Sequence, residues 1–321
     1  MEVSASCEGG HRDALSSYRS PYLSHQVHSR LASNDAHFAP PTLRPHRRCP
    51  VSGRGRALRL RDRLSERDLG MLRDLARLRL LTGSQLRRLH FTVGDLTTQA
   101  RKARNAIRRL AELDLIVRLS RRVGGMRAGS EGYVIGLSGW GHAVLALDST
   151  AEPRRRRRVI ETKPAFQSHV LAVSELYVQL VEASRLGLAE LIDFAGEPEA
   201  WRRFGGLGGH VIVLKPDAFI RLGIGEFEVL AFIEQDMDTE SLPTIVRKCE
   251  VYIAHWRSGL EQRQLGAYPK VWWLVPSVHR ANSIRRALKR LPGEAHALFE
   301  VCLTTEAVPY LTQPLPEGGA S

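Results

Sequence analysis

Residues 227–236 have the sequence FEVLAFIEQD, and this stretch decides which fold the second half of the chain adopts. An apolar run of this length that ends in polar residues predicts a buried β-strand. Glu234 and Asp236 stand two positions apart at its end, so they share one face of the strand. Upstream, Lys215-Pro216-Asp217 marks another strand boundary. If the strand after Pro216 pairs beside the first, three carboxylates meet at one edge of a sheet.

Converging carboxylates are the ligands that a hard divalent cation prefers. We therefore expect Asp217, Glu234 and Asp236 to bind Mg²⁺ or Mn²⁺. Such an ion positions a phosphodiester and lowers the pKa of an attacking water. Glu175, on the inward side of the preceding predicted helix, is a candidate fourth ligand. The alternative is an acidic strand end and loop without a metal, in which Lys248 forms a structural ion pair with Asp236 or Asp217.

The elements around this strand predict a mixed α/β domain over residues 164–305. Apolar residues recur at helical spacing in several segments, and short apolar runs between them predict strands. The flanking Gly205-Gly206-Leu207-Gly208-Gly209 lacks the GK[ST] of a phosphate-binding loop, which favours a flexible loop. Helices are expected at 169–186, 244–258 and 283–291, and strands at 189–195, 210–214 continuing to 219–222, and 271–275.

Residues 64–150 have the pattern of three helices followed by a β-hairpin. Ser65 stands three positions before Asp68, which is the signature of a capped helix start. Further helices are expected at 85–91 and 96–113, and two short alternating strands then flank a glycine-rich basic turn. This order predicts a winged helix-turn-helix.

The third of these helices has a basic face opposite its apolar stripe. Residues three, four and seven positions apart are neighbours on a helix surface. In helix-turn-helix proteins the corresponding helix enters the DNA major groove, where Arg recognises guanine and Asn recognises adenine. The alternatives are a solvated basic face and a winged helix that binds a protein. The predicted DNA contacts are Thr98, Arg101, Lys102, Arg104, Asn105, Arg108 and Arg109 on the helix, and Arg121, Arg122 and Arg127 in the hairpin.

Charge is divided unequally along the chain. Residues 1–163 contain 32 basic and 15 acidic side chains, whereas residues 164–321 contain 15 and 19. Such asymmetry is typical of a polyanion-binding region joined to a second domain. Composition further predicts a disordered basic tail at 1–63, a basic linker at 151–163 and a C-terminal tail at 306–321.

Several classes of protein are disfavoured by the sequence. No apolar run reaches the roughly 18 residues of a membrane span, and the N-terminus lacks the pattern of a secretory signal. The four cysteines are far apart and form no CxxC pair, which argues against a zinc ribbon or a disulfide scaffold. We therefore predict a cytoplasmic protein that does not associate with membranes.

The order of these motifs resembles the replication-relaxation family of actinobacteria over about residues 64–292. The resemblance rests on the basic winged helix, Pro216-Asp217, the sequence FIEQDMDTES at 232–241, and a following helix with Lys248 and Tyr252. The second half also resembles PD-(D/E)XK nucleases, in which Asp is followed by Glu-x-Lys. Here Asp236 occupies the lysine position, and Lys248 is the candidate substitute. The resemblance implies a catalytic set of Glu175, Asp217, Glu234, Asp236 and Lys248.

The family resemblance implies a role in plasmid or mobile-element replication. We therefore predict a protein that binds double-stranded DNA and regulates replication or transfer of a plasmid or integrated element. The first alternative is a metal-dependent endonuclease or nickase. The second is a transcriptional regulator whose second domain is not catalytic and only dimerises or holds a partner. Besides DNA, the expected partners are a second copy of the chain or proteins of replication and transfer.

Overall fold

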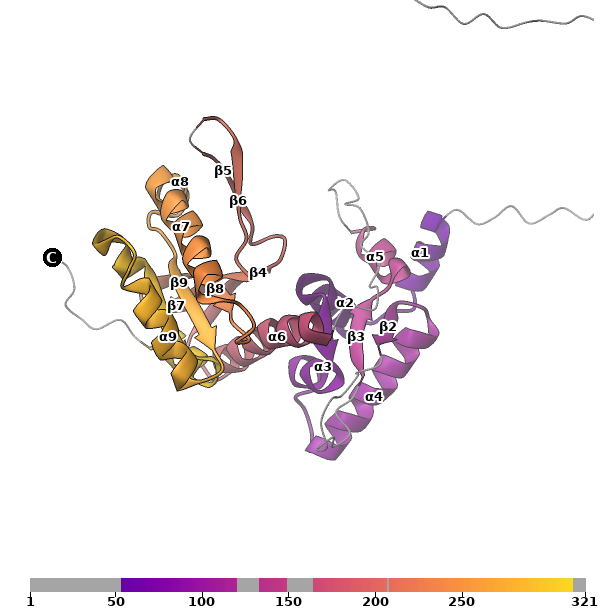
Figure 1. The fold of residues 1–321 in the computed structure, drawn as a ribbon. Helices are drawn as coiled ribbons and strands as arrows, with labels where there is room; N and C mark the ends of the chain where they lie inside the picture. Colours follow the sequence, from indigo (N-terminus) through magenta and orange to yellow (C-terminus); the bar gives the residue numbers. More distant parts are fainter. Residues whose placement is uncertain (1–52, 120–132, 149–163, 207, 314–321) are drawn as a thin grey trace, which may run out of the picture. The chain divides into compact units, whose positions relative to one another are not determined.

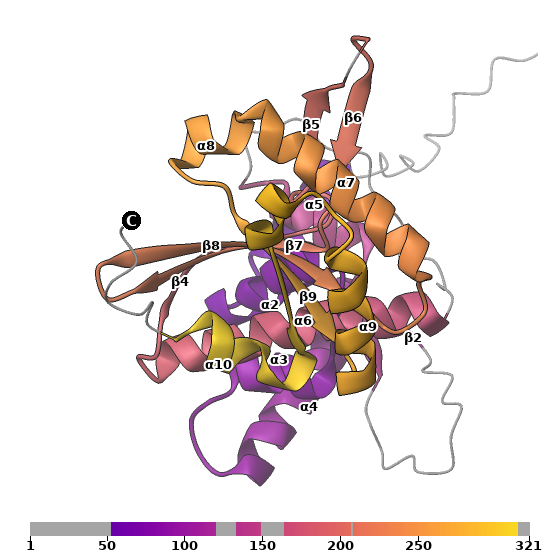
Figure 2. The same cartoon turned by 60° about the vertical axis from the view of Figure 1, so that its left-hand side comes forward.

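The computed structural model describes residues 53–119, 133–148, 164–206 and 208–313. These residues all belong to one compact unit of the chain, Cys49–Ser321. Its elements form a mixed α/β structure (Figures 1 and 2). None of the helices in the described ranges is long and apolar enough to cross a membrane.

The first part of the unit consists of helices around a small sheet, as the sequence predicts. Side-chain caps begin its helices: Ser65 and Thr82 each form a capping box, and Asp95 accepts the N–H of Thr98. The sheet is antiparallel with the order β1-β3-β2. The elements are α1 (Gly53–Arg61), α2 (Glu66–Leu78), β1 (Leu80–Thr82), α3 (Gly83–His90), α4 (Leu96–Glu112), β2 (Ile116–Leu119), β3 (Val134–Leu137) and α5 (Gly139–Leu145).

Each of the two predicted tails, 1–63 and 306–321, contains a helix. Helix α1 lies inside the segment predicted as disordered, and it buries Ala57 and Leu60. The Arg56 guanidinium lies 4.2 Å from the centre of the Trp140 ring on α5, which helps to explain why this arginine-rich stretch is ordered. Helix α10 (Ala307–Leu311) lies inside the predicted C-terminal tail and buries its first and last residues.

The second part is built on a five-stranded mixed sheet with the order β10-β9-β8-β7-β4. Strands β10, β9 and β8 are parallel, whereas β7 and β4 are antiparallel to their neighbours. A separate hairpin of β5 and β6 projects from this part (Figures 1 and 2). The elements are α6 (Pro164–Arg185), β4 (Glu190–Gly196), β5 (Arg202–Gly205), β6 (Val211–Leu214), β7 (Ala218–Ile224), β8 (Phe227–Gln235), α7 (Leu242–Ser258), α8 (Leu260–Leu265), β9 (Lys270–Val275), α9 (Val278–Leu288) and β10 (Phe299–Leu303).

Side chains alternate between two hydrophobic cores on opposite faces of the sheet, because successive residues of a strand point to opposite sides. On β8, Phe232 packs in the core that contains residues of α7 and α9, such as Tyr252 and Ile284. Its neighbour Ile233 packs in the core that contains α6 and the helices of the first part. The main sheet is therefore covered on both faces, which explains the long apolar run of β8.

Besides the two helices inside the predicted tails, the sequence analysis omits β1, α5, β5, α8 and β10. Strand β5 is absent from it because its four residues, RRFG, include two arginines and a glycine and show no apolar run. The glycine-rich stretch predicted as a loop joins β5 to β6. Helix α9 begins at Val278, five residues before the predicted start, because Ser277 caps it.

Candidate nucleic-acid interface and buried acid cluster

Helix α4 presents its basic side chains to solvent, as its pattern predicts. Ala103, Ile107 and Leu110 are buried on one side. Arg101, Lys102, Arg104, Asn105, Arg108 and Arg109 are exposed. Within the described ranges, Arg101, Lys102 and Arg104 form no ion pair. Their positive charges are therefore not neutralised by the carboxylates that the structure describes.

The four other predicted contacts on α4 have partners within the chain. Arg108 donates to Asn105 Oδ1 at 3.3 Å and lies 3.9 Å from Glu112. The Arg109 guanidinium is bonded to Asp68, a buried carboxylate of α2. The Thr98 hydroxyl donates to Asp95 Oδ2 at 2.7 Å within the helix cap.

Arg109 and Thr98 thus have structural partners that the sequence pattern did not indicate. Arg121, Arg122 and Arg127 lie outside the described residues.

Helix α3, which precedes α4, is fixed to α6 by polar contacts. The Arg88 guanidinium is bonded to both Glu175 and Glu182 of α6. The side-chain amide of Gln85 donates to Glu175 Oε2 at 3.0 Å. Arg185 donates to the carbonyl oxygens of Arg88, at 2.7 Å, and of Leu89, at the end of α3. These bonds hold the helix that leads into α4.

The position of Glu175 corrects its predicted role. The structure does not bring Glu175 to the other carboxylates of the predicted metal site, because its side chain faces α3 and is held there by Arg88, Gln85 and Gln179. The helical pattern gave the correct element but not the direction in which this side chain points.

Asp217, Glu234 and Lys248 do lie together at the end of the sheet. The Asp217 N–H donates to Ile233 O at 3.0 Å, which places Asp217 across from Glu234 on the antiparallel pair β7–β8. Lys248, on α7, extends to Glu234 and places its Nζ 3.2 Å from Glu234 Oε2. The same ammonium lies 2.9 Å from Glu240 Oε1. The juxtaposition of Lys248 with the strand end agrees with the sequence analysis.

Glu234 is almost fully buried, with 2% of its surface exposed. Burial and the charge of Asp217 raise its pKa to about 8, although Lys248 and a hydrogen bond from the Tyr252 hydroxyl at 2.7 Å oppose the shift. Burial lowers the pKa of Lys248, but Glu234 and Glu240 outweigh that effect and raise the pKa above its usual value. Both groups therefore lie in a poorly solvated environment, in which burial disfavours the charged form of each.

Asp236 lies on the same face of the sheet as Glu234, as its spacing predicts, but contacts a different helix. Both of its carboxylate oxygens accept bonds from Arg280 of α9, at 2.7 and 2.9 Å. Arg280 also donates to Glu240 O and lies 3.1 Å from Asp238. The predicted convergence of three carboxylates is thus not present in this structure: Asp236 is paired with an arginine that the sequence analysis did not identify.

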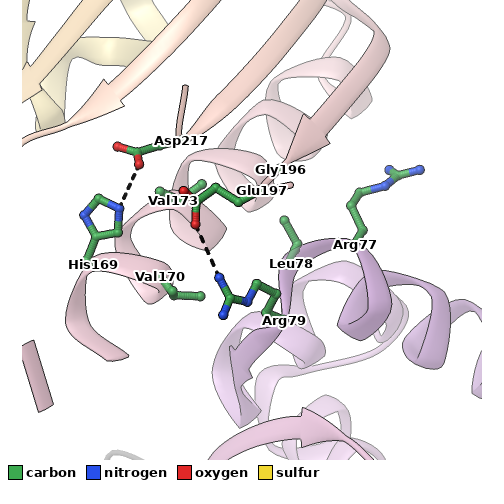
Figure 3. A pocket seen from close by; sticks show the side chains of 9 residues that line it. All are labelled: Arg77, Leu78, Arg79, His169, Val170, Val173, Gly196, Glu197 and Asp217. Atoms are coloured by element: carbon green, nitrogen blue, oxygen red, sulfur yellow. Dashed lines mark hydrogen bonds and ion pairs between the residues drawn. The ribbon is translucent and has the colours of Figure 1, made fainter. Parts of the chain in front are cut away.

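A small pocket adjoins Asp217, and Figure 3 shows the residues that line it. His169 Nε2 lies 3.1 Å from Asp217 Oδ1, and Arg79 Nη1 lies 3.3 Å from Glu197 Oε2. Burial lowers the pKa of His169. The hydrogen bond and the charge of Asp217 together outweigh this effect, so the net shift of the pKa is upward. Burial and the charge of Asp217 raise the pKa of Glu197. Neither His169 nor Glu197 has a sequence signal, because each comes to this pocket only through the fold.

The donors around these carboxylates do not fit a Mg²⁺ or Mn²⁺ site. Asp217 Oδ1 faces His169, and its Oδ2 accepts the Gln235 N–H at 2.7 Å. Both oxygens of Glu234 also have protein donors, from Tyr252 and Lys248. Within the described ranges, no three His, Cys, Asp or Glu side chains are placed to hold a metal ion. The oxygens that a hard cation needs are already occupied by N–H and O–H groups.

Comparison with protein families gives a match to this chain. The model of the replication-relaxation family matches residues 72–271. The chain belongs to the replication-relaxation family. The match includes α3, α4 and α6, together with Asp217, Glu234 and Lys248, but it ends before Arg280. No curated protein and no solved structure matches the chain.

Proposed function

We propose that this member of the replication-relaxation family binds double-stranded DNA through α4 and so controls replication or transfer of a plasmid or integrated element. Helices α2, α3 and α4 with the β2–β3 hairpin act as a winged helix, with α4 in the major groove. The protein works in the cytoplasm, where such DNA is found. The family match supports the replication context, and the geometry of α4 supports DNA as the partner.

The exposed charge of α4 carries the proposal. Arg101, Lys102 and Arg104 have no described acidic partner, so they are available to phosphates. The opposite side of α4 is anchored by Ile107 and Leu110 in the core, and Arg109 bonds to Asp68. One side of this helix is fixed in the core, and the other side has the positive charges of Arg101, Lys102 and Arg104. Such a helix is suited to a polyanion, because these three side chains can bind phosphates and release counterions from DNA without breaking an internal ion pair.

Equilibrium binding of the full chain to labelled duplex DNA tests this role. Replacing Arg101, Arg104 and Arg108 together by Ala is expected to weaken binding about a hundredfold near physiological salt, because three phosphate or base contacts are lost. A matched control replaces the exposed Arg247, Arg257 and Arg263 of α7 and α8, which removes the same charge. The proposal fails if the two triple variants bind DNA equally well.

A metal-dependent DNA endonuclease is the second candidate function, and one observation favours it. Asp217, Glu234 and Lys248 lie together at the end of the sheet, and two carboxylates beside a lysine are part of the catalytic set that the sequence resemblance to PD-(D/E)XK nucleases implies. Against it stand the pairing of Asp236 with Arg280 and the protein donors on every oxygen of Asp217 and Glu234. We therefore propose that the cluster mainly stabilises the sheet end and does not cleave DNA.

A supercoiled-plasmid assay with Mg²⁺ or Mn²⁺ distinguishes the two functions. The expected result is that the purified chain shifts the plasmid but leaves it supercoiled. Nicking or linearisation that disappears in Asp217→Asn and persists in the Arg247→Ala control would establish the nuclease instead. Asp217→Asn keeps the side-chain shape, so a loss of cleavage would report chemistry and not unfolding.

A further inference from the structure

Helix α9 has a second basic surface that no part of the proposed function uses. Its inner side buries Ala281, Ile284 and Leu288 against the sheet. Its outer side exposes side chains at helical spacing, so they form one continuous surface. We name this surface the α9 face: His279, Asn282, Arg285 and Arg286 of the helix, and Lys289 and Arg290 directly after its end, all exposed.

The α9 face is positively charged in the half of the chain that is otherwise acidic. Residues 276–292 contain five basic residues and no acidic ones, whereas residues 164–321 as a whole have 15 basic and 19 acidic. Of the five, only Arg280 turns inward to a carboxylate. In the part of the chain that the structure describes, Arg285 donates to the Val301 carbonyl at 2.6 Å, Arg286 donates to Ser283 Oγ, and neither forms an ion pair.

The α9 face repeats the local pattern of α4. Residues 105–109 are NAIRR and residues 282–286 are NSIRR. In both helices the Ile is buried in a core. In both, the first Arg donates to the Asn Oδ1 three positions earlier, at 3.3 Å in α4 and at 3.4 Å in α9. The Asn, the buried Ile and the first Arg are thus in the same register on two separate helices, whereas the second Arg is bonded to Asp68 in α4 and donates to Ser283 in α9.

We propose that the α9 face is a second binding surface for duplex DNA. Four exposed arginine and lysine side chains without described acidic partners complement a row of phosphates, and Arg binds phosphate oxygens through two parallel hydrogen bonds. A membrane surface would need an apolar stripe beside the charges, but among the described residues of α9 only Val278 is a large exposed apolar side chain. An acidic protein would supply fewer charges per unit length than duplex DNA does.

A consequence is that one chain contacts DNA at two helices. The salt dependence of binding then exceeds what α4 alone produces, because each neutralised phosphate adds about 0.9 to the slope of log K against log salt. The two contacts lie on the same compact unit. Binding to both strengthens the complex without a second protein copy.

The test compares triple alanine variants of the full chain on a labelled duplex of several helical turns. Replacing Arg286, Lys289 and Arg290 is expected to weaken binding about tenfold and to lower the salt slope by about 2 to 3. Because none of the three forms a described ion pair, the thermal unfolding temperature should stay unchanged. The control is the Arg247, Arg257 and Arg263 variant, which lowers the net charge equally and should keep the wild-type salt slope.

The outcomes separate this inference from the role of α4. If the α9 variant binds like the control while the α4 variant loses binding, the inference is overturned and the proposed function stands. If the α9 variant loses affinity and slope while the α4 variant does not, the α9 face binds DNA and the proposed role of α4 is wrong. Losses in both variants beyond the control support both, and losses in neither overturn both.

Discussion

The basic face of α4 and the acid cluster at the sheet end differ in how their charges are neutralised. On α4, Arg101 and Arg104 are exposed and have no acidic partner among the described residues. At the sheet end, Glu234 and Asp236 are buried and every carboxylate oxygen has a protein donor. An exposed charge without a partner is available to a ligand, whereas a buried charge depends on its partner within the fold, because removing that partner leaves it uncompensated.

Removing Arg280 is expected to have the largest effect on stability. Arg280→Ala leaves Asp236 buried without its partner, which should lower the free energy of unfolding by about 3–5 kcal/mol. Denaturant unfolding measures the loss. Asp236→Asn combined with Arg280→Met removes both charges and should recover part of it. If Arg280→Ala changed the free energy of unfolding by less than about 1 kcal/mol, the pair would not hold the sheet end. The contrast between the exposed charges of α4 and the buried charges of the sheet end would then fail.

The pH dependence of stability tests the buried cluster more directly. The pKa of Glu234 is raised to about 8 in the folded chain from its ordinary value of 4.5. Between these values the folded chain binds more protons than the unfolded chain, so this group makes the free energy of unfolding fall as pH rises. The contribution is at most ~1.4 kcal/mol per pH unit.

Glu234→Gln should flatten this decline between about pH 5 and pH 8. Urea unfolding across this range, with the exposed Glu226→Gln as the matched control, gives the comparison. Parallel curves for wild type and Glu234→Gln would show that Glu234 does not titrate in this window, which would contradict its shifted pKa.

Two arginines of α4, Arg109 and Arg104, offer the smallest and sharpest contrast. Arg109→Ala removes the partner of the buried Asp68 and should destabilise the chain by about 1–2 kcal/mol with little change in DNA affinity. Arg104→Ala removes an unpaired exposed charge and should weaken DNA binding severalfold while stability stays within about 0.5 kcal/mol. Thermal unfolding and DNA titration of both variants measure the two effects. If instead Arg104→Ala lowered stability and Arg109→Ala weakened DNA binding, then a bonded partner within the chain would not distinguish structural residues from DNA-binding residues.

Local patterns gave several helices and strands correctly where the signal lay within a few residues. Ser65 and Asp68 form the predicted capping box, and the apolar run of β8 forms a central strand. The position of Asp217 beside Glu234 followed from one correct assumption, that their strands are neighbours. These features depend on spacing along the chain, which a single sequence contains.

Contacts between segments that are distant along the chain could not be predicted from the sequence. Arg280 meets Asp236 across 44 positions and His169 meets Asp217 across 48, and the identity of neither partner signals the other. Glu175 was placed on the correct helix, but its direction depends on how α3 packs against α6. The α9 face had a usable signal, the absence of acidic residues from 276 to 292, but its exposure became clear only from the fold.

The salt dependence of DNA binding by the full chain tests the central claim most directly. We predict that log K falls linearly with log salt concentration, and that the Arg101, Arg104 and Arg108 alanine variant shows a slope smaller by about 2 to 3, because about three phosphate contacts are missing. The Arg247, Arg257 and Arg263 variant should keep the wild-type slope. Equal slopes for the wild type and the α4 variant, or no measurable binding of duplex DNA by the wild type at low salt, would contradict DNA binding through α4.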